Sequence, residues 1–292
     1  MSFLVSKEWE EPSMERILVP LQGFPAEVNA INLAFNLAEA SKARISVLHC
    51  KESFTKESEF WLNRLSGHIK SRSVLLNVPY DTEEVKRYRA SDAIIKSSQK
   101  EECDLIVMSA ARTPTYRHHF GSTARRVARK SKVPVLVVVS WLEDFASHQE
   151  PVLRKILMPI RSTGKDWSAL HLGAALKGSS AAANTELIAL NMTLLPLVAS
   201  LTVVDAPEFQ LERKHFMNDV TRLAEQIGIG ITAKHAAGRD LGEVAINIAN
   251  TEQVDLIILG AHQKPHRFGA ILGRVSKKIA SKAEVAVVII FL

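Results

Sequence analysis

The run Gly121-Ser122-Thr123 combines residue types that suit the binding of an anion. A glycine lets the backbone approach a ligand closely, and the free amides at the start of a helix bind phosphate. Basic residues just before the run could add positive charge: Arg117, His118 and His119. In the alternative interpretation, a hydroxyl of the run only caps the helix by accepting hydrogen bonds from its first amides.

A second run of this kind begins at Gly273, which is followed by Arg274 and Val275. Gly260 lies upstream of it, at the end of an apolar run. Three basic residues lie between the two glycines: Lys264, His266 and Arg267. A basic loop beside a helix N-terminus suits an anion, and a loop that is merely solvated is the alternative.

Two short apolar runs, Ile17-Leu18-Val19-Pro20 and Ile156-Leu157-Met158-Pro159, have the composition of buried strands. Gln22 and Arg161 follow them at matching positions. A guanidinium at a strand end favours phosphate or carboxylate, because its planar donors match both groups. Arg161 could equally pair with Asp166. We therefore add Pro20, Gln22, Pro159 and Arg161 to the candidate binding residues.

Motifs that indicate catalysis are missing from the sequence. It contains no Gly-x-x-x-x-Gly-Lys-[Ser/Thr] phosphate loop, no Gly-x-Ser-x-Gly nucleophile turn and no His-Glu-x-x-His metal helix. The adjacent side chains of His118 and His119 diverge and do not predict a metal site. We therefore predict no catalytic residue and no metal, hence a binding protein rather than an enzyme. Slow ATP hydrolysis is the enzymatic alternative.

The elements that must position these residues occur twice in the chain. The run Asp104–Ser109 returns as Asp255–Gly260, with an aspartate followed by Leu-Ile in both copies. A repeat as long as a small domain indicates two copies of one fold rather than a solenoid. We expect one domain at residues 15–141 and another at 153–292.

Within each half, apolar runs alternate with segments of helical periodicity, which predicts crossover connections and a parallel sheet. The strands expected in the first half are Arg16–Leu21, Arg44–His49, Val74–Val78, Asp104–Ser109 and Val133–Ser140. The helices expected there are Ala26–Ser41, a segment around Phe60–Ile69, Ala90–Glu102 and Ser122–Ser131. In the second half, Glu186–Met192 is the favoured second strand and Ala199–Val204 is its competitor.

Four motifs in this order resemble a universal stress protein domain: Ile-Leu-Val-Pro, Asp-Leu-Ile-Val-Met, Gly-Ser-Thr-Ala-Arg-Arg-Val and Val-Pro-Val-Leu-Val-Val. The second half repeats them, so the whole chain resembles a tandem universal stress protein. The resemblance implies an α/β fold of the adenine-nucleotide alpha-hydrolase kind. Each half would then form an open parallel sheet of order 3-2-1-4-5, with helices on both faces and a ligand cleft between strands one and four.

Nucleotide-binding members of this family carry Gly-x2-Gly-x9-Gly-[Ser/Thr] after strand four and an Asp after the proline of strand one. This sequence departs from that pattern in both halves. The residues that replace the expected glycines, hydroxyl and acids are Ser109, Arg112, Gln263, Arg274, Gln22 and Arg161. The resemblance therefore implies degenerate sites for ATP, AMP or a small anion in a stress-response or regulatory binding module. The alternative is a protein-interaction module that binds no nucleotide.

Composition indicates an ordinary globular protein, with 47% hydrophobic and 23% charged residues and a net charge of +6. Without interleaved aromatic residues, the basic helices that include Arg125 and Lys277 indicate solvated faces rather than nucleic acid binding. We expect Cys50 and Cys103 to be reduced, and we expect a cytoplasmic protein, since charges interrupt the N-terminus. Polar residues break the apolar run Leu187–Val204, so no membrane span is expected.

We expect an unidentified protein partner, and we expect the two halves to form an intrachain pseudo-dimer. Val133–Val139 and Val285–Leu292 are apolar on both strand faces. An exposed sheet edge of that kind aggregates unless it is paired or covered. Pairing of the two fifth strands within one chain satisfies this requirement, and a homodimer is the second arrangement.

Overall fold

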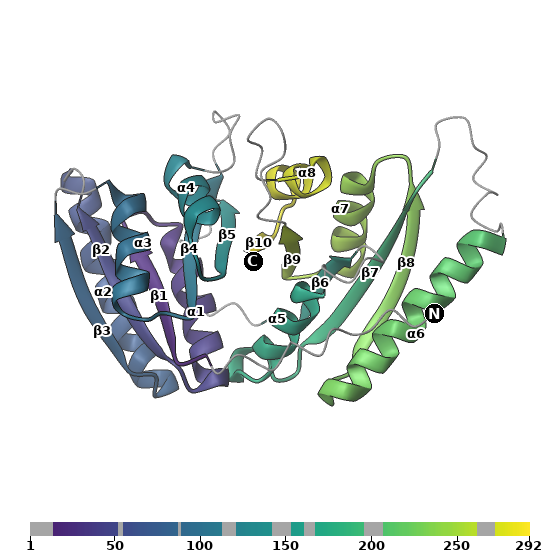
Figure 1. The fold of residues 1–292 in the computed structure, drawn as a ribbon, viewed down its shortest axis with the longest axis horizontal. Helices are drawn as coiled ribbons and strands as arrows, with labels where there is room; N and C mark the ends of the chain where they lie inside the picture. Colours follow the sequence, from purple (N-terminus) through teal and green to yellow (C-terminus); the bar gives the residue numbers. More distant parts are fainter. Residues whose placement is uncertain are drawn as a thin grey trace. The chain divides into compact units, whose positions relative to one another are not determined.

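The computed structural model describes residues 14–51, 55–86, 89–112, 121–141, 153–160, 167–195, 207–261 and 272–292. The chain separates into two compact units, most of which lie on either side of the boundary between Gln149 and Glu150. Figure 1 draws the first unit in purple to teal and the second in green to yellow. Each unit is described by itself below.

The first unit alternates strands and helices throughout. Its elements are β1 (Arg16–Leu21), α1 (Glu27–Ser41), β2 (Arg44–Lys51), α2 (Lys56–Leu76), β3 (Tyr80–Lys86), α3 (Ala90–Lys100), β4 (Leu105–Arg112), α4 (Ser122–Lys130) and β5 (Val135–Trp141). The strands lie in the order β3-β2-β1-β4-β5, and the paired strands are parallel. The order 3-2-1-4-5 expected for the fold is confirmed.

The second unit repeats this arrangement. Its elements are β6 (Lys155–Ile160), α5 (Ser168–Lys177), the 3-10 turn η2 (Ser180–Ala182), β7 (Glu186–Leu194), α6 (Pro207–Ile227), β8 (Ile231–Gly238), α7 (Leu241–Glu252), β9 (Leu256–Ala261), α8 (Arg274–Lys282) and β10 (Ala286–Phe291). The order β10-β9-β6-β7-β8 is the same topology read from the other edge. The assignment of Glu186–Met192 as the second strand is confirmed by β7, whereas the competing segment Ala199–Val204 lies outside the described residues.

The central strands are apolar because both of their faces are covered. β1 and β6 each bury five consecutive residues, which requires packing on both sides of the sheet. In the first unit α1 packs on α2 and α3 packs on α4, and these two helix pairs provide that cover. In the second unit α7 packs on α8, while α5 and α6 contact the strands.

The strand predicted at Val74–Val78 is wrong. α2 continues to Leu76 and ends at Asn77, which has a left-handed φ of 54°. Val74 and Leu75 are 78% and 64% exposed on this helix, so their apolar character does not reflect burial. The third strand is Tyr80–Lys86, an edge strand that pairs with β2 alone among the described strands and can therefore be polar.

Both cysteines are free and buried, as the sequence predicted. Burial raises the pKa of the Cys103 thiol to about 12, so this side chain stays protonated at neutral pH. Within the described part of the chain, no helix is both long and apolar enough to span a bilayer.

Candidate functional site

The strands on either side of the topological switch point separate toward their carboxyl ends. In the first unit β1 pairs with β2 through six positions, but with β4 only at Ile17–Leu105 and Leu18–Ile106. In the second unit β6 pairs with β9 only at Ile156–Leu256 and Leu157–Ile257. The sheet therefore opens where a ligand binds in folds of this topology, outside the carboxyl ends of the strands.

The helices that follow the separating strands begin without a side-chain cap. The cap residue of α4 is Gly121 and that of α8 is Gly273, and a glycine offers no side-chain acceptor. Ser122 is the first helical residue of α4 rather than its cap, so the interpretation of the hydroxyl run as a cap is wrong. Neither helix has an acid in its first turn. The first backbone amides of both helices can therefore donate hydrogen bonds to an anion.

These helix starts are accessible. Gly121 and Ser122 are exposed and Thr123 is half-buried. In the second unit Gly273 and Arg274 are exposed, and Val275 is half-buried. A Cβ added at either glycine would meet no atom of the described residues within 4 Å. Within the described part of the chain, the two starts therefore leave room for a ligand group.

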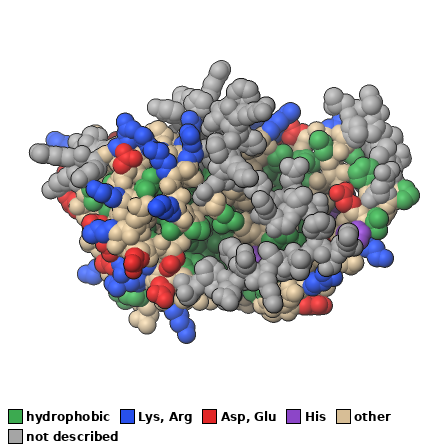
Figure 2. Space-filling model, in the orientation of Figure 1, with side chains coloured by type: hydrophobic (Ala, Val, Ile, Leu, Met, Phe, Trp, Pro, Cys, Tyr) green, Lys and Arg blue, Asp and Glu red, His purple; other side chains and the backbone are tan. Residues whose placement is uncertain are grey.

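The basic faces of α4 and α8 are partly paired rather than simply solvated. Lys278 of α8 lies 2.7 Å from both Asp240 and Glu243 of α7, and these contacts lower the pKa of each carboxyl group. Arg126 of α4 makes a longer contact of 3.8 Å to Asp92 of α3. Basic and acidic side chains are also interspersed on the face shown in Figure 2.

The loop after β1 holds a residue that sequence reasoning missed. Pro20 is buried in β1 and Gln22 is half-buried. The backbone amide of Gln22 donates a hydrogen bond of 2.8 Å to the carboxylate of Glu27, the first residue of α1. The sequence shows only an acid at the start of a helix, just after Gly-Phe-Pro, and this pattern does not distinguish Glu27 from an ordinary acid of a first turn.

The described residues assemble only part of each candidate site. Pro159 is buried in β6, and Gly260 is half-buried in β9. The other candidate residues lie outside the described ranges: Arg117, His118, His119, Arg161, Asp166, Gln263, Lys264, His266 and Arg267. What the structure places at the switch points is therefore the strand ends, the first loop of the first unit and the starts of α4 and α8.

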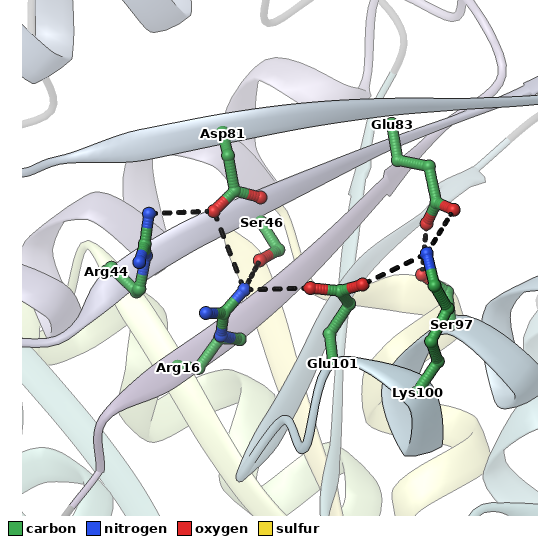
Figure 3. A network of polar contacts seen from close by, with 8 residues as sticks. All are labelled: Arg16, Arg44, Ser46, Asp81, Glu83, Ser97, Lys100 and Glu101. Carbon is green, nitrogen blue, oxygen red and sulfur yellow. Dashed lines mark hydrogen bonds and ion pairs between the residues drawn. The ribbon is translucent and has the colours of Figure 1, made fainter.

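A polar cluster that was not predicted lies at the opposite end of the first sheet (Figure 3). Its members are Arg16, Arg44, Ser46, Asp81, Glu83, Ser97, Lys100 and Glu101. Arg16 and Arg44 are the first residues of β1 and β2, so the cluster lies at the amino ends of the strands. Most of its side chains line a cavity of about 260 Å³.

The charges of this cluster pair with one another. Arg16 lies 3.0 Å from Glu101 and 3.5 Å from Asp81. Lys100 lies 2.9 Å from Glu83 and 3.2 Å from Glu101, and its hydrogen bond lowers the pKa of Glu83. The cluster therefore connects β1 and β3 to the end of α3, and we call it the strand brace.

The second unit contains a related brace with a different distribution of charge. Lys155 lies 3.6 Å from Glu186 and 3.7 Å from Glu252, and Lys234 lies 2.5 Å from Glu252. By strand register, Lys234 occupies the position that Glu83 has in the first unit. The repeat aligns Thr251 with Lys100. The acid Glu83 on the edge strand of the first unit is thus a lysine in the second unit, and Lys100 is replaced there by Thr251. This paired exchange indicates that the brace has a structural role and is not a ligand site.

This exchange predicts a result for the first unit. Glu83→Lys should lower the melting temperature of the first unit for two reasons. The new ammonium group faces Lys100, and the carboxylate that accepts the hydrogen bond from Ser97 is removed. Adding Lys100→Thr should restore most of the loss, since the double variant copies the second unit. Thermal unfolding of both single variants and the double variant measures the coupling. Purely additive effects would contradict the paired brace.

Comparisons with known proteins agree with this architecture. The profile of the universal stress protein family matches residues 14–139 and 153–290. The structure is similar to a universal stress protein from Archaeoglobus fulgidus DSM 4304, with 14% identity, a TM-score of 0.61 and coverage of 94% of this chain and 98% of that one. A functionally unknown protein from Pseudomonas aeruginosa PAO1 has 15% identity, a TM-score of 0.60 and coverage of 94% and 92%.

A single-unit relative provides a comparison with a bound ligand. It is a universal stress protein from Archaeoglobus fulgidus in complex with dAMP. This relative is 17% identical, and the match covers 42% of this chain and 96% of that one with a TM-score of 0.35.

Proposed function

The chain belongs to the universal stress protein family, and we propose that it is a cytoplasmic stress-response binding module that takes the phosphate of an adenine nucleotide, or a small anion, at the starts of α4 and α8. The supporting observation is the pair of glycine-capped helix starts, which follow the strands that separate at each switch point. For its two domains we keep the limits 15–141 and 153–292.

The adenine-nucleotide class comes from the family, one member of which was solved in complex with dAMP. The phosphate end of such a ligand needs backbone donors and room, and both helix starts offer these. The ribose end of the ligand has fewer matching groups in the first unit. Gln22 replaces the acid that would accept a hydrogen bond from a ribose hydroxyl, and the backbone amide of Gln22 already donates to the Glu27 carboxylate. We therefore expect weak binding led by the phosphate group.

The proposed activity is binding rather than catalysis. Binding of a phosphate by helix-start amides needs neither a nucleophile nor a general base. In the described part of the chain, no group of three or more His, Cys, Asp or Glu side chains could hold a metal ion. ATP hydrolysis by the purified protein, measured as released phosphate, would show that the enzymatic alternative applies.

The glycine caps provide the test of the proposed function. Gly121→Val and Gly273→Val should each lower the affinity for ATP, AMP and inorganic phosphate at their own site by about tenfold or more, because a branched side chain blocks approach to the amides. Folding should be unaffected, since an added Cβ at either position meets no atom within 4 Å in the described ranges. Calorimetric titration of both variants and of the double variant measures the loss.

Gly230→Val is the matched control for these variants. Gly230 is exposed, an added Cβ there also meets no atom within 4 Å, and it precedes the amino end of β8, away from the switch point. This variant should bind as the parent does. Undiminished binding by the double Gly121→Val/Gly273→Val variant would place the ligand elsewhere and overturn the proposal.

A protein-interaction module is the second candidate. Large apolar side chains are exposed on the first unit: Phe24, Phe60, Val74 and Leu75. Exposed apolar groups on a soluble unit are common at protein-binding surfaces. Mass spectrometry of small molecules released from the purified protein by heat separates the two candidates. Release of a stoichiometric adenine nucleotide favours the first, and its absence together with flat phosphate titrations favours the second.

A further inference from the structure

The loop after β1 directs three backbone amides at one carboxylate. Gln22 N lies 2.8 Å from Oε1 of Glu27, and Gly23 N and Phe24 N each lie 3.0 Å from Oε2. Both carboxylate oxygens are therefore bound by the main chain. Three converging N–H groups are the donor set with which proteins bind small anions.

The carboxyl group of Glu27 is buried, and no cation pairs with it among the described residues. Glu27 is 4% exposed, and in the described structure its carboxyl group accepts hydrogen bonds from the three amides of the loop. Burial raises its pKa to about 7, and the hydrogen bonds from Phe24, Gln22 and Gly23 oppose this rise. The three backbone hydrogen bonds therefore offset only part of the cost of burying the charge, and Glu27 is a mixture of carboxylate and carboxylic acid near pH 7.

The loop conformation is fixed by contacts that do not involve the side chain of Glu27. Gly23 has a φ of +90°, and it approaches α2 so closely that a Cβ would collide with the Ser58 carbonyl. The carbonyl of Phe24 accepts a hydrogen bond of 3.1 Å from the amide of residue 27, a main-chain contact that any side chain there would preserve. The three amides should therefore keep their positions after the carboxylate is removed.

We propose that this loop is a carboxylate-binding cradle that the chain fills with its own Glu27, so that external anions can enter it only when that side chain is removed or displaced. The ligand class is a small monocarboxylate such as formate or acetate. In the first unit the three donors at the end of β1 are therefore already occupied. The inference stands apart from nucleotide binding, since it concerns the loop after β1 and not the start of α4.

Glu27→Ala should empty the cradle and make it accessible to formate. Sodium formate should raise the melting temperature of this variant in a saturable manner, and more than sodium chloride does at equal ionic strength. The parent should respond to formate less than this variant does, because its cradle is full and formate can act only at the starts of α4 and α8. Glu59→Ala is the matched control, since Glu59 is an exposed carboxylate on α2. Equal responses of Glu27→Ala to both salts would overturn the proposal.

Glu27→Gln keeps the test valid if the alanine variant does not fold. A glutamine fills the space with a neutral group, so the two proteins differ in the ionisation of residue 27. The folded pKa of Glu27 lies above its ordinary value of 4.5, so the folded parent binds more protons than the unfolded parent between pH 4.5 and about 7. Stability of the parent relative to the variant should therefore fall as pH rises through this window.

The shift from 4.5 to about 7 corresponds to a change of roughly 300-fold in the relative unfolding equilibrium constants. Urea unfolding of both proteins across this range measures it. A ratio that stays constant from about pH 3 to about pH 9 would mean that Glu27 titrates as it does in the unfolded chain. That result would contradict the burial of the Glu27 carboxyl group in the loop, and with it the proposal of a filled cradle, whatever the protein does with nucleotides.

Discussion

Gly23→Ala is expected to destabilise the first unit by about 4 kcal/mol, close to the whole stability of many small domains. The left-handed φ of +90° at this residue costs a side chain about 1–2 kcal/mol. In addition, the new Cβ would collide with the carbonyl oxygen, carbonyl carbon and Cα of Ser58. These are backbone atoms at the start of α2, which cannot rotate away as a side chain would.

Two other glycines separate the contributions of strain and collision. Gly228 has a φ of +67° but open space around it, so Gly228→Ala should cost only about 1 kcal/mol. Gly67 lies within α2 with open space and helical backbone, so Gly67→Ala should stabilise by about 1 kcal/mol. Urea unfolding followed by circular dichroism measures all three. If Gly23→Ala proves no worse than Gly228→Ala, the close approach to Ser58 is not a real constraint.

The sequence pattern predicted the sheet order because its strongest signals are buried. β1, β4 and β5 are apolar on both faces, and parallel sheets require such runs. The same rule caused the error at Val74–Val78. Val74 and Leu75 of that run are exposed near the end of α2, while the edge strand Tyr80–Lys86 is polar. The apolar composition of a segment therefore predicts the central strands of a sheet well and its edge strands poorly.

The two helix starts in the candidate site were predicted from the sequence, whereas the contacts of Glu27 were not. The sequence indicated Gly121 and Gly273 as the starts of binding helices, and both are helix caps in the structure. Glu27 could not be recognised in the same way, because its pattern is that of an ordinary acidic first turn. Only the three-dimensional loop shows that its carboxylate is buried against main-chain amides.

The strand brace could not be predicted from the sequence for a different reason. Its members come from segments that are far apart in the sequence, so no local motif marks them. The comparison of the two halves does contain a signal, since Glu83 and Lys100 change together to Lys234 and Thr251. Paired changes between repeats therefore indicate contacts that a single copy does not.

Asp104→Ala is expected to destabilise the first unit by about 3 kcal/mol, although the residue lies outside the sheet. Its Oδ2 accepts hydrogen bonds of 2.8 Å and 2.9 Å from the backbone amides of Glu15 and Arg16. Its own amide donates a bond of 2.9 Å to the Arg16 carbonyl. Removal of the carboxylate leaves two main-chain donors at the start of β1 without this charged acceptor.

The repeat supports this structural interpretation of the aspartate. Asp255 makes the same two contacts, of 2.7 Å to the Arg154 amide and 2.9 Å to the Lys155 amide, at the start of β6. Both aspartates precede their strands at the amino ends, away from the switch point. We therefore expect Asp104→Ala and Asp255→Ala to lower stability in their own units and to leave ligand affinity of the folded protein unchanged.

The variant Asp104→Asn separates the contribution of the hydrogen-bond acceptor at residue 104 from that of its negative charge. Asp104→Asn keeps a side-chain oxygen that can accept from the same amides, so it should cost only about 1 kcal/mol. Asp92→Ala is the control for loss of a carboxylate, because Asp92 is half exposed and lies 3.8 Å from Arg126. That change should cost less than about 1 kcal/mol. If Asp104→Asn is as damaging as Asp104→Ala in urea unfolding, the charge rather than the acceptor geometry fixes the start of β1, and the strand would depend on electrostatics that salt should weaken.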